Sequence, residues 1–322
     1  MALPKPGQQR EILVHLRESD APYRGLLNQD ADQQFRYRFC ASEEEVRQYI
    51  GDAEIVLGSI TFPTGLLARA KKLRWIQVTG AGIDRFLAAA ELPDDVILTR
   101  ADVAFGSQIA EYVFGHLLAR TQQVIELRHD QDRRTWTPRM LTWLAGRTMA
   151  IAGTGSIGQA VALRARGMQM HVTGYARATT WLPEFDRIFG PPRLRDFLRE
   201  ADVVVITLPL TDQTQGLIGA EAFAEMKPSA VLVNVARGAI VQQEALLKAL
   251  QEGEIAGAIL DVFETEPLPA NHSLWEMPNV TITPHHAGLN IPEEIAAFFL
   301  ENLHRYDRGE PLQGVVDPRR GY

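Results

Sequence analysis

The chain has little cysteine, no cluster of zinc ligands and no long apolar run, and each absence excludes a class of protein. Its single cysteine, Cys40, cannot form a disulfide within the chain, and no cysteines and histidines have the spacing of a zinc site. Apolar runs such as Val203–Ile206 are far shorter than the roughly 20 residues that cross a membrane. The first residues contain no apolar signal core. We therefore expect a cytoplasmic protein without a bound metal, in which Cys40 is a small buried apolar side chain.

The chain also lacks an excess of positive charge. Its 322 residues include 33 lysines and arginines and 40 aspartates and glutamates, which gives a net charge of −7. Negative charge disfavours the phosphates of nucleic acids and of anionic membranes, so we expect neither as a partner. A hydrophobic content of 46% is ordinary for a folded globular protein, and the length allows two domains.

What the chain does contain is a glycine-rich stretch directly after the apolar run Met149–Ala152. Gly153, Gly155 and Gly158 form a G-x-G-x-x-G pattern, and the helix candidate Ser156–Arg166 follows. The first glycine permits a sharp turn, the second lets a pyrophosphate approach the backbone, and the third lets helix and strand pack closely. The N-terminal end of the helix attracts the phosphate. Because a strand precedes the glycines and a helix follows them, the stretch predicts a dinucleotide-binding site.

Short strand and helix candidates alternate on both sides of this stretch. Before it lie the strand candidates Ile12–Leu16, Ile55–Leu57, Trp75–Val78 and Val96–Leu98 and the helix candidates Glu43–Ile50 and Leu66–Lys72. The later strand candidates are Met149–Ala152, His171–Tyr175, Val203–Leu208, Val231–Val235, Ile255–Leu260 and Val280–Thr283, with helices at Ser156–Arg166, Leu194–Glu200 and Gln242–Glu252. Such alternation predicts an α/β fold with parallel sheets, the second of them doubly wound.

Two further helices are expected outside this pattern. Ser107–Leu127 carries an apolar band that is wider than one core-facing stripe requires. We interpret it as buried against its own domain and a partner subunit, although a central helix of a large monomer fits as well. A last helix is expected to run to about Tyr306 from Asn290, which forms a capping-box pattern with Glu293.

Charged side chains follow three strands of the second half, where an ordinary turn does not need them. Arg237 follows one strand, Glu266 a second, and the pair His285 and His286 a third. The carboxyl ends of a doubly wound sheet lie on one edge, beside the cofactor. An arginine there can bind a carboxylate through two parallel bonds, and a histidine beside a carboxylate can exchange a proton. Each residue alone has a structural explanation, but together they predict hydride transfer to a 2-keto acid.

At this point the chain resembles the D-isomer-specific 2-hydroxyacid dehydrogenase family, and it looks most like the glyoxylate/hydroxypyruvate reductase branch. The matching stretches are Gly80–Asp84, Ile109–Tyr112, Gly153–Gly158, Asn234–Gly238, Leu260–Leu268 and Thr283–Gly288. The resemblance implies an NAD(P)-dependent oxidoreductase that reduces small 2-keto acids to D-2-hydroxy acids. A phosphoglycerate dehydrogenase-like enzyme and a non-catalytic, dinucleotide-sensing corepressor-like protein remain as alternatives.

The resemblance also implies two Rossmann-like, doubly wound parallel-sheet domains. The first, flavodoxin-like and discontinuous, would comprise residues 1–99 and 290–322 and bind the substrate. Residues 100–289 would form the inserted dinucleotide-binding domain. The active site would lie in the cleft between the domains, whose closure excludes water. A homodimer through the helix at residues 107–127 comes with the same resemblance.

Roles at the active site follow from the same resemblance. Arg237 would bind the carboxylate and keto oxygen of the substrate, His285 would be the general acid/base, and Glu266 would be the partner of His285. The backbone at Ala81 and Gly82 would receive the substrate carboxylate, although a plain turn explains these residues equally well.

The cofactor contacts come partly from the glycine pattern and partly from the resemblance, which places Asp261 at the nicotinamide carboxamide. The candidates are Gly153, Gly155, Ser156, Ile157, Gly158, Ala176, Arg177, Leu208, Pro209, Ala236, Asp261, His285 and Gly288. His286 stands where the family usually has an apolar residue, and we interpret it as packing beside the active residues.

One departure from the family bears on the choice of cofactor. NAD-preferring relatives have an aspartate at the end of the second strand, where it binds the ribose 2′-hydroxyl. This chain has Ala176 there, followed by Arg177 and, soon after, by Thr179 and Thr180. Without the carboxylate a 2′-phosphate is not repelled, and the arginine can bind it. The sequence therefore predicts that NADP(H) is preferred over NAD(H).

Overall fold

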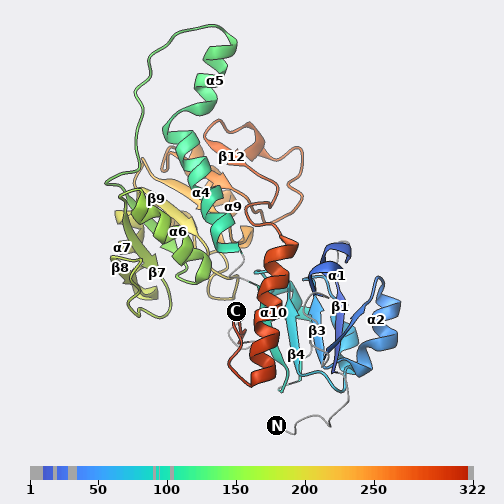
Figure 1. Ribbon diagram of the computed structural model, residues 1–322. Coiled ribbons are helices and arrows are strands. Elements are labelled where there is room, and N and C mark those ends of the chain that lie inside the picture. Colours follow the sequence, from blue (N-terminus) through green and yellow to red (C-terminus); the bar gives the residue numbers. More distant parts are fainter. Residues whose placement is uncertain are drawn as a thin grey trace. The chain divides into compact units, whose positions relative to one another are not determined.

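The computed structural model describes residues 10–16, 20–27, 35–89, 92–93, 95–101 and 105–317 (Figure 1). It divides into two compact units, Met1–Phe105 with Asn290–Tyr322, and Gly106–Leu289. The first unit extends beyond residue 99 because the next residues continue its sheet: the amide of Ala101 donates to the carbonyl of Val78.

The first unit contains a parallel sheet of five strands in the order β2-β1-β3-β4-β5. Its strands are β1 (Arg10–His15), β2 (Phe35–Phe39), β3 (Ile55–Gly58), β4 (Trp75–Val78) and β5 (Ile97–Arg100). Its helices are α1 (Ala21–Leu27), α2 (Glu43–Tyr49), α3 (Asp84–Ala89) and α10 (Pro292–Arg308). This strand order is that of flavodoxin-like sheets. Every residue of β3 and β4 is buried, as expected for a sheet covered on both faces.

α10 brings the C-terminal part of the chain back onto this first sheet (Figure 1). The ring of Trp75 on β4 stacks on Phe299 and Tyr306 of α10, with centroids 5.2 and 5.5 Å apart. Asn302 lies on the same helix with no exposed surface, and its side chain donates to Oε1 of Gln77 over 3.1 Å. The first unit is therefore built from both ends of the chain.

Several boundaries in the first unit differ from the prediction. The capping box at Asn290 does not form: Ile291 is the N-cap of α10 and has no side-chain capping bond. The helix expected at 66–72 is a 3₁₀ turn over Thr64–Arg69. Strand β2 and the helices α1 and α3 were not predicted. β2 is an edge strand in which arginines alternate with aromatic residues. This alternation has the period of a strand, so it was a readable signal that the prediction missed.

The second unit contains a parallel sheet of seven strands in the order β12-β11-β10-β9-β6-β7-β8. Its strands are β6 (Thr148–Ala152), β7 (His171–Tyr175), β8 (Arg187–Phe189), β9 (Val203–Ile206), β10 (Val231–Asn234), β11 (Gly257–Leu260) and β12 (Val280–Ile282). Its helices are α4 (Gly106–Thr121), α5 (Val124–Asp132), α6 (Ser156–Gly167), α7 (Leu194–Glu200), α8 (Ala220–Ala224) and α9 (Gln243–Gln251). The order reverses between β6 and β9, as in Rossmann sheets. The predicted fold class is therefore confirmed. The unpredicted β8 is a short strand at the edge.

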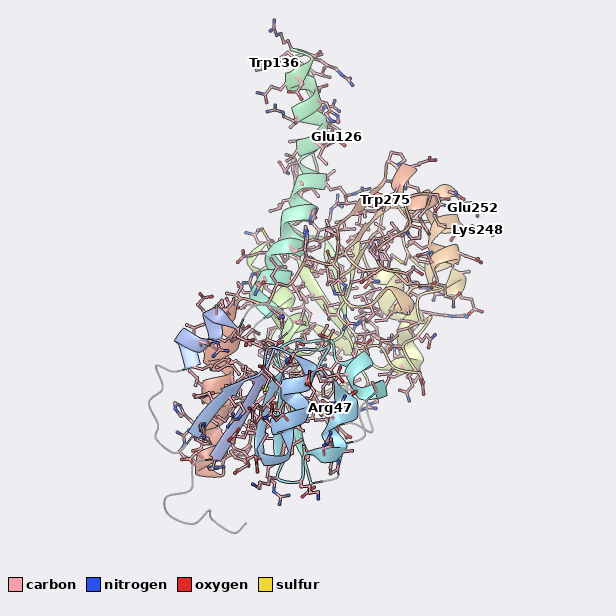
Figure 2. The ribbon with its side chains drawn as sticks, turned by 90° about the vertical axis from the view of Figure 1, so that its right-hand side faces the viewer. Arg47, Glu126, Trp136, Lys248, Glu252 and Trp275 are labelled. Carbon is pink, nitrogen blue, oxygen red and sulfur yellow. The ribbon has the colours of Figure 1, made fainter. Side chains whose placement is uncertain are left out.

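The prediction of one long helix over residues 107–127 is wrong in one respect, because the segment forms two helices. Gln123 has a φ of 50° and separates α4 from α5. α4 buries its apolar side against its own unit, whereas α5 buries no residue. We call residues 122–147 the arm. It projects from the unit (Figure 1), and Trp136 lies near its tip, beyond Glu126 (Figure 2).

The single cysteine lies in the core of the first unit. Cys40 is 1% exposed, and burial raises the pKa of its thiol to about 11. The thiol is thus protonated at neutral pH and serves as the small buried side chain that was predicted. Within the described residues, no helix is long and apolar enough to cross a membrane.

Candidate active site

The carboxyl ends of the second sheet lie in a single row. The parallel register places the ends of six strands opposite one another in the order Tyr175, Ala152, Ile206, Asn234, Leu260 and Ile282. Each predicted charged or glycine-rich segment of this unit starts just after one of these residues. The sheet therefore collects them along one edge, on both sides of the point where the strand order reverses.

The glycine loop after β6 has the geometry that a pyrophosphate needs. Gly153 has a φ of 112°, and a Cβ on Gly158 would lie 1.9 Å from the carbonyl oxygen of Gly153. Glycine is therefore required at both positions. A Cβ on Gly155 would meet nothing within 4 Å, which leaves open space over the loop. Gly155 is also the N-cap of α6 and provides no side-chain cap, so the first turn, which includes Ser156 and Ile157, can bind an anion.

A residue that the sequence did not single out fixes this loop. The hydroxyl of Thr207, just after β9, donates to the carbonyls of Ala152 and Gly153 over 3.2 and 2.9 Å. It precedes Leu208 and Pro209, which were predicted to contact the cofactor. Thr207 was predicted to lie inside the strand Val203–Leu208, whereas the strand ends at Ile206.

The end of β7 carries the residues predicted to set the cofactor preference. Ala176 is half-buried, and its amide donates to the carbonyl of Phe189 on β8. Arg177, Thr179 and Thr180 are exposed and follow directly. This strand end therefore carries an exposed arginine and two hydroxyl groups but no acidic side chain.

Arg237 is presented by a turn that Asn234 shapes. The side chain of Asn234 donates to the carbonyl of Arg237 over 3.0 Å and accepts from the amide of Ala236 over 3.1 Å. Asn234 is 1% exposed, so these bonds are well shielded from water. One guanidinium nitrogen of Arg237 donates to the carbonyl of Ala236. The turn therefore holds the half-buried Arg237 through local bonds.

Gly238 places the Arg237 turn directly against the loop that carries Glu266. A Cβ on Gly238 would lie 1.9 Å from the carbonyl carbon of Phe263, so only glycine fits. The amide of Phe263 in turn donates to Oε1 of Glu266 over 2.9 Å. The loops after β10 and β11 are thereby packed together.

His285 and Glu266 meet as predicted from the strand ends. Nδ1 of His285 lies 2.7 Å from Oε2 of Glu266, and their side chains are 50% and 29% exposed. An ionised carboxylate can only accept, so Nδ1 carries the proton and Nε2 is left to exchange one. The pair has the geometry that a general acid/base and an orienting carboxylate require.

His285 itself has a backbone conformation that few residues adopt. Its φ is 54°, in the left-handed region, which costs about 1–3 kcal/mol for a non-glycine residue. Histidine, like asparagine and aspartate, is enriched there. Asp261 supports the turn: its main chain accepts from the amide of His285, and its carboxylate accepts from the amides of His286 and Ala287 over 3.0 and 2.9 Å. Such strain, held by its surroundings, is typical of functional sites.

Asp261 is 2% exposed and lies at the end of β11. Its Oδ1 also accepts from the hydroxyl of Thr283 over 2.6 Å, and its Oδ2 accepts only one of the bonds described. Two carboxylate oxygens offer about four acceptor positions. These bonds therefore leave one acceptor position of Oδ2 unused. Gly288 follows this turn and is half-buried.

Ala81 and Gly82 belong to the first unit, where they follow β4. Arg100 donates to the carbonyl of Ala81 over 3.3 Å. Their contact with the substrate stays a prediction.

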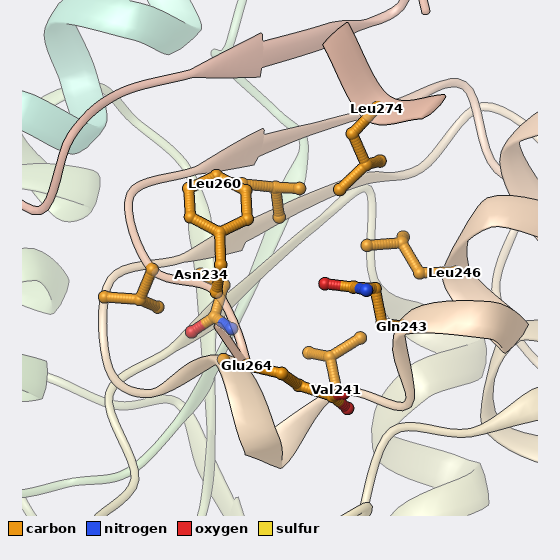
Figure 3. A pocket seen from close by; sticks show the side chains of 10 residues that line it. Asn234, Val241, Gln243, Leu246, Leu260, Glu264 and Leu274 are labelled. Atoms are coloured by element: carbon orange, nitrogen blue, oxygen red, sulfur yellow. The ribbon is translucent and has the colours of Figure 1, made fainter. Parts of the chain in front are cut away.

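A small pocket is lined by Gly238 and nine other residues of the second unit (Figure 3). Side chains from β10, β11 and α9 converge on it, including Asn234, Leu260 and Leu246. None of the predicted site residues, all of which lie in the described part of the chain, lines this pocket. Among the described residues there is also no group of three acidic, cysteine or histidine side chains that could hold a metal.

Comparison with known proteins agrees with this geometry. The family model for the NAD-binding domain of D-isomer-specific 2-hydroxyacid dehydrogenases matches residues 114–287. A glyoxylate reductase of Thermococcus kodakarensis is 35% identical over 279 residues, which cover 83% of this chain and 83% of that protein.

Two solved structures are similar over nearly the whole length. One is a D-isomer-specific 2-hydroxyacid dehydrogenase from Xanthobacter autotrophicus in complex with NADPH and MES, at 32% identity and a TM-score of 0.86, covering 98% of this chain and 99% of that one. The other is an NADPH-dependent glyoxylate/hydroxypyruvate reductase from Sinorhizobium meliloti in complex with NADP and sulfate, at 27% identity and a TM-score of 0.86, covering 98% and 100%. The chain therefore belongs to the D-isomer-specific 2-hydroxyacid dehydrogenase family and is an oxidoreductase with an NAD(P)-binding domain.

Proposed function

We propose that this protein reduces small 2-keto acids such as glyoxylate or hydroxypyruvate to D-2-hydroxy acids, with NADPH as the preferred cofactor. The observation that carries the proposal is the 2.7 Å pair of His285 and Glu266 on the same sheet edge as the glycine loop. The two reductases described above act on substrates of this class and support the proposal.

Each residue of the site has one task in this reaction. Arg237 binds the carboxylate and keto oxygen of the substrate, and a bidentate guanidinium contact orients it. His285 delivers the proton from Nε2 to the keto oxygen, while Glu266 stabilises the charged imidazole. Ala81 and Gly82 offer main-chain amides to the substrate carboxylate. When bound, the reduced nicotinamide supplies the hydride.

The cofactor is held by the strand ends on either side of the reversal of strand order. The open space at Gly155 and the uncapped first turn of α6 accept the pyrophosphate. Asp261 accepts from the carboxamide and thereby orients the ring. Ala176 and Arg177 favour a 2′-phosphate, because no carboxylate repels it. The NADPH-bound and NADP-bound relatives support this preference.

The decisive experiment compares kcat/KM for glyoxylate and hydroxypyruvate with NADPH and with NADH. We expect turnover of at least one keto acid and a higher kcat/KM with NADPH. A preference for NADH would overturn the cofactor assignment but leave the reductase. Binding of NADPH without turnover of a broad panel of 2-keto acids would overturn the reductase and favour the sensing alternative.

A homodimer through α4 and the arm is part of the same proposal. The arm exposes the large apolar side chains Val124, Ile125, Leu127, Trp136, Met140 and Trp143. Several large exposed apolar side chains on one projecting segment are typical of an interface between proteins. Sedimentation of the wild-type chain and of an Ile125→Glu variant tests it: we expect a dimer that the charge weakens, and a monomeric wild-type chain would contradict the proposal.

A further inference from the structure

A polar stripe on α4 supports the loop that carries His285. Gln108, Tyr112 and His116 are spaced at i, i+4 and i+8, so they share one face of the helix. Oε1 of Gln108 accepts from the amide of Leu289 over 2.9 Å. The hydroxyl of Tyr112 lies 2.7 Å from Oγ1 of Thr283. The stripe thus contacts the loop on both sides of His285.

The hydroxyl protons of Tyr112 and Thr283 can be arranged in one way only. Thr283 is 8% exposed, and its hydroxyl donates its only proton to Oδ1 of Asp261 over 2.6 Å. Its oxygen can therefore only accept from Tyr112, whose phenol must donate. Burial raises the pKa of Tyr112 to about 12, so the donor is retained at neutral pH. A chain of donors thus runs from Tyr112 through Thr283 to Asp261.

The end of this chain is the left-handed turn of His285. Asp261 accepts from Thr283 and from the amide of His286 on the same oxygen, Oδ1. Its other oxygen accepts from Ala287, and its carbonyl accepts from His285. The orientation of this one carboxylate therefore sets the main chain on either side of a residue with a φ of 54°.

We propose that Tyr112 is a positioning residue for His285 and acts through the hydroxyl of Thr283 and the carboxylate of Asp261. The inference rests on the role proposed for His285. Loss of the Tyr112 hydroxyl leaves Thr283 free to rotate its proton away from Asp261, and the turn then loses the restraint that aims the imidazole.

Packing alone offers a competing explanation, and a conservative variant separates the two. The Tyr112 ring lies 4.4 Å from the ring of His116 and 6.0 Å from that of His286, between centroids. Tyr112→Phe keeps these ring contacts and removes only the hydroxyl. Tyr306→Phe is a matched control, because the hydroxyl of Tyr306 donates to Glu54 over 2.9 Å in the other unit.

The test measures keto-acid turnover and, independently, the imidazole resonances of His285 in protein labelled with ¹⁵N-histidine. His285→Asn identifies those resonances. In Tyr112→Phe and Thr283→Val we expect kcat to fall by about tenfold or more with KM for the keto acid little changed, similar to the loss when the outer partner of a metal-binding histidine is removed. Thr283→Ser, which keeps the hydroxyl, should restore most of kcat, and Tyr306→Phe should leave it unchanged. The His285 resonances should move in Tyr112→Phe and Thr283→Val only.

Two results would overturn the inference. One is His285 resonances at wild-type positions in both Tyr112→Phe and Thr283→Val, whether or not the wild-type chain reduces a keto acid. The other is a Thr283→Ser variant as impaired as Thr283→Val. If the wild-type chain reduces no keto acid while the resonances do move, the positioning of His285 stands and the reductase proposal falls.

Discussion

The two units each contain a buried polar network, and the networks differ in where they end. In the first unit Nε1 of Trp75 donates to Thr99, Thr99 donates to Gln77, and Asn302 donates to Gln77, over 2.7, 2.8 and 3.1 Å. All four residues are 0% exposed. In the second unit the chain from Tyr112 through Thr283 and Asp261 reaches His285, whose side chain is half exposed.

The two networks show that buried polar groups can support different parts of a fold. A buried polar atom without a partner is costly, so each network is stable only as a complete set. The first set closes within the core and specifies how α10 docks on the sheet, because only the correct register places Asn302 beside Gln77. The second set ends on His285, whose half-exposed side chain lies in a left-handed turn. The first network therefore supports the docking of α10, and the second supports the main chain that carries His285.

The largest expected effect comes from the exposed end of the second network. In His285→Asn we expect kcat for keto-acid reduction to fall by about 10²–10⁴-fold, the usual contribution of a general acid. Asparagine tolerates the left-handed conformation, so the turn is retained. Denaturant unfolding should show a free energy close to that of the wild type. Turnover within tenfold of the wild type in this folded variant would contradict the proposed role of His285 and, with it, the difference between the two networks.

The next effect is on stability and comes from the closed network. Asn302→Leu removes three bonds, to Gln77 and to the amide and carbonyl of Gln313, and leaves Gln77 buried and Gln313 half-buried. We expect the free energy of unfolding to fall by about 2–4 kcal/mol with kcat unchanged at temperatures where the variant is folded. Asn271→Leu, at an exposed position, is the control and should change it by less than about 0.5 kcal/mol. A loss of kcat in folded Asn302→Leu would mean that the first network also serves the site.

The sequence revealed the exposed end of one network and almost nothing of the other. Glu266 and His285 could be predicted because charged residues follow several apolar strands of one sheet, although each residue alone has a structural explanation. Gln77 lies inside the strand Trp75–Val78, and its partner Asn302 is far along the chain. No local pattern connects two such residues, because only the packing of α10 brings them together.

The strands and helices also differ in how well the sequence predicts them. Central strands such as β9 and β10 are continuous apolar runs and were predicted nearly to the residue, whereas the short edge strands β2 and β8 carry arginines and were not. The break at Gln123 has no glycine or proline to mark it. The spacing of Gln108, Tyr112 and His116 was a readable signal for the polar stripe, but the apolar band of the same helix concealed it.

The smallest expected effect is on how the free energy of unfolding depends on pH. The second network contains the titratable residues Tyr112 and Asp261 and has His116 beside it, whereas none of the four members of the first network titrates. Burial lowers the pKa of His116 on α4, the nearby His286 lowers it further, and Asp261 opposes them. Tyr112 also faces His116 but stays neutral in this range.

Because the fold favours neutral His116, the unfolded chain binds more protons below the ordinary histidine pKa of about 6.5. The stability associated with His116 is therefore complete above that pH and is lost as the pH falls through the lowered pKa. We expect the free energy of unfolding to fall more steeply between about pH 7 and pH 5 in the wild type than in His116→Gln. Equal slopes would show that His116 titrates alike in both states and that α4 imposes no charge restraint beside the loop of His285.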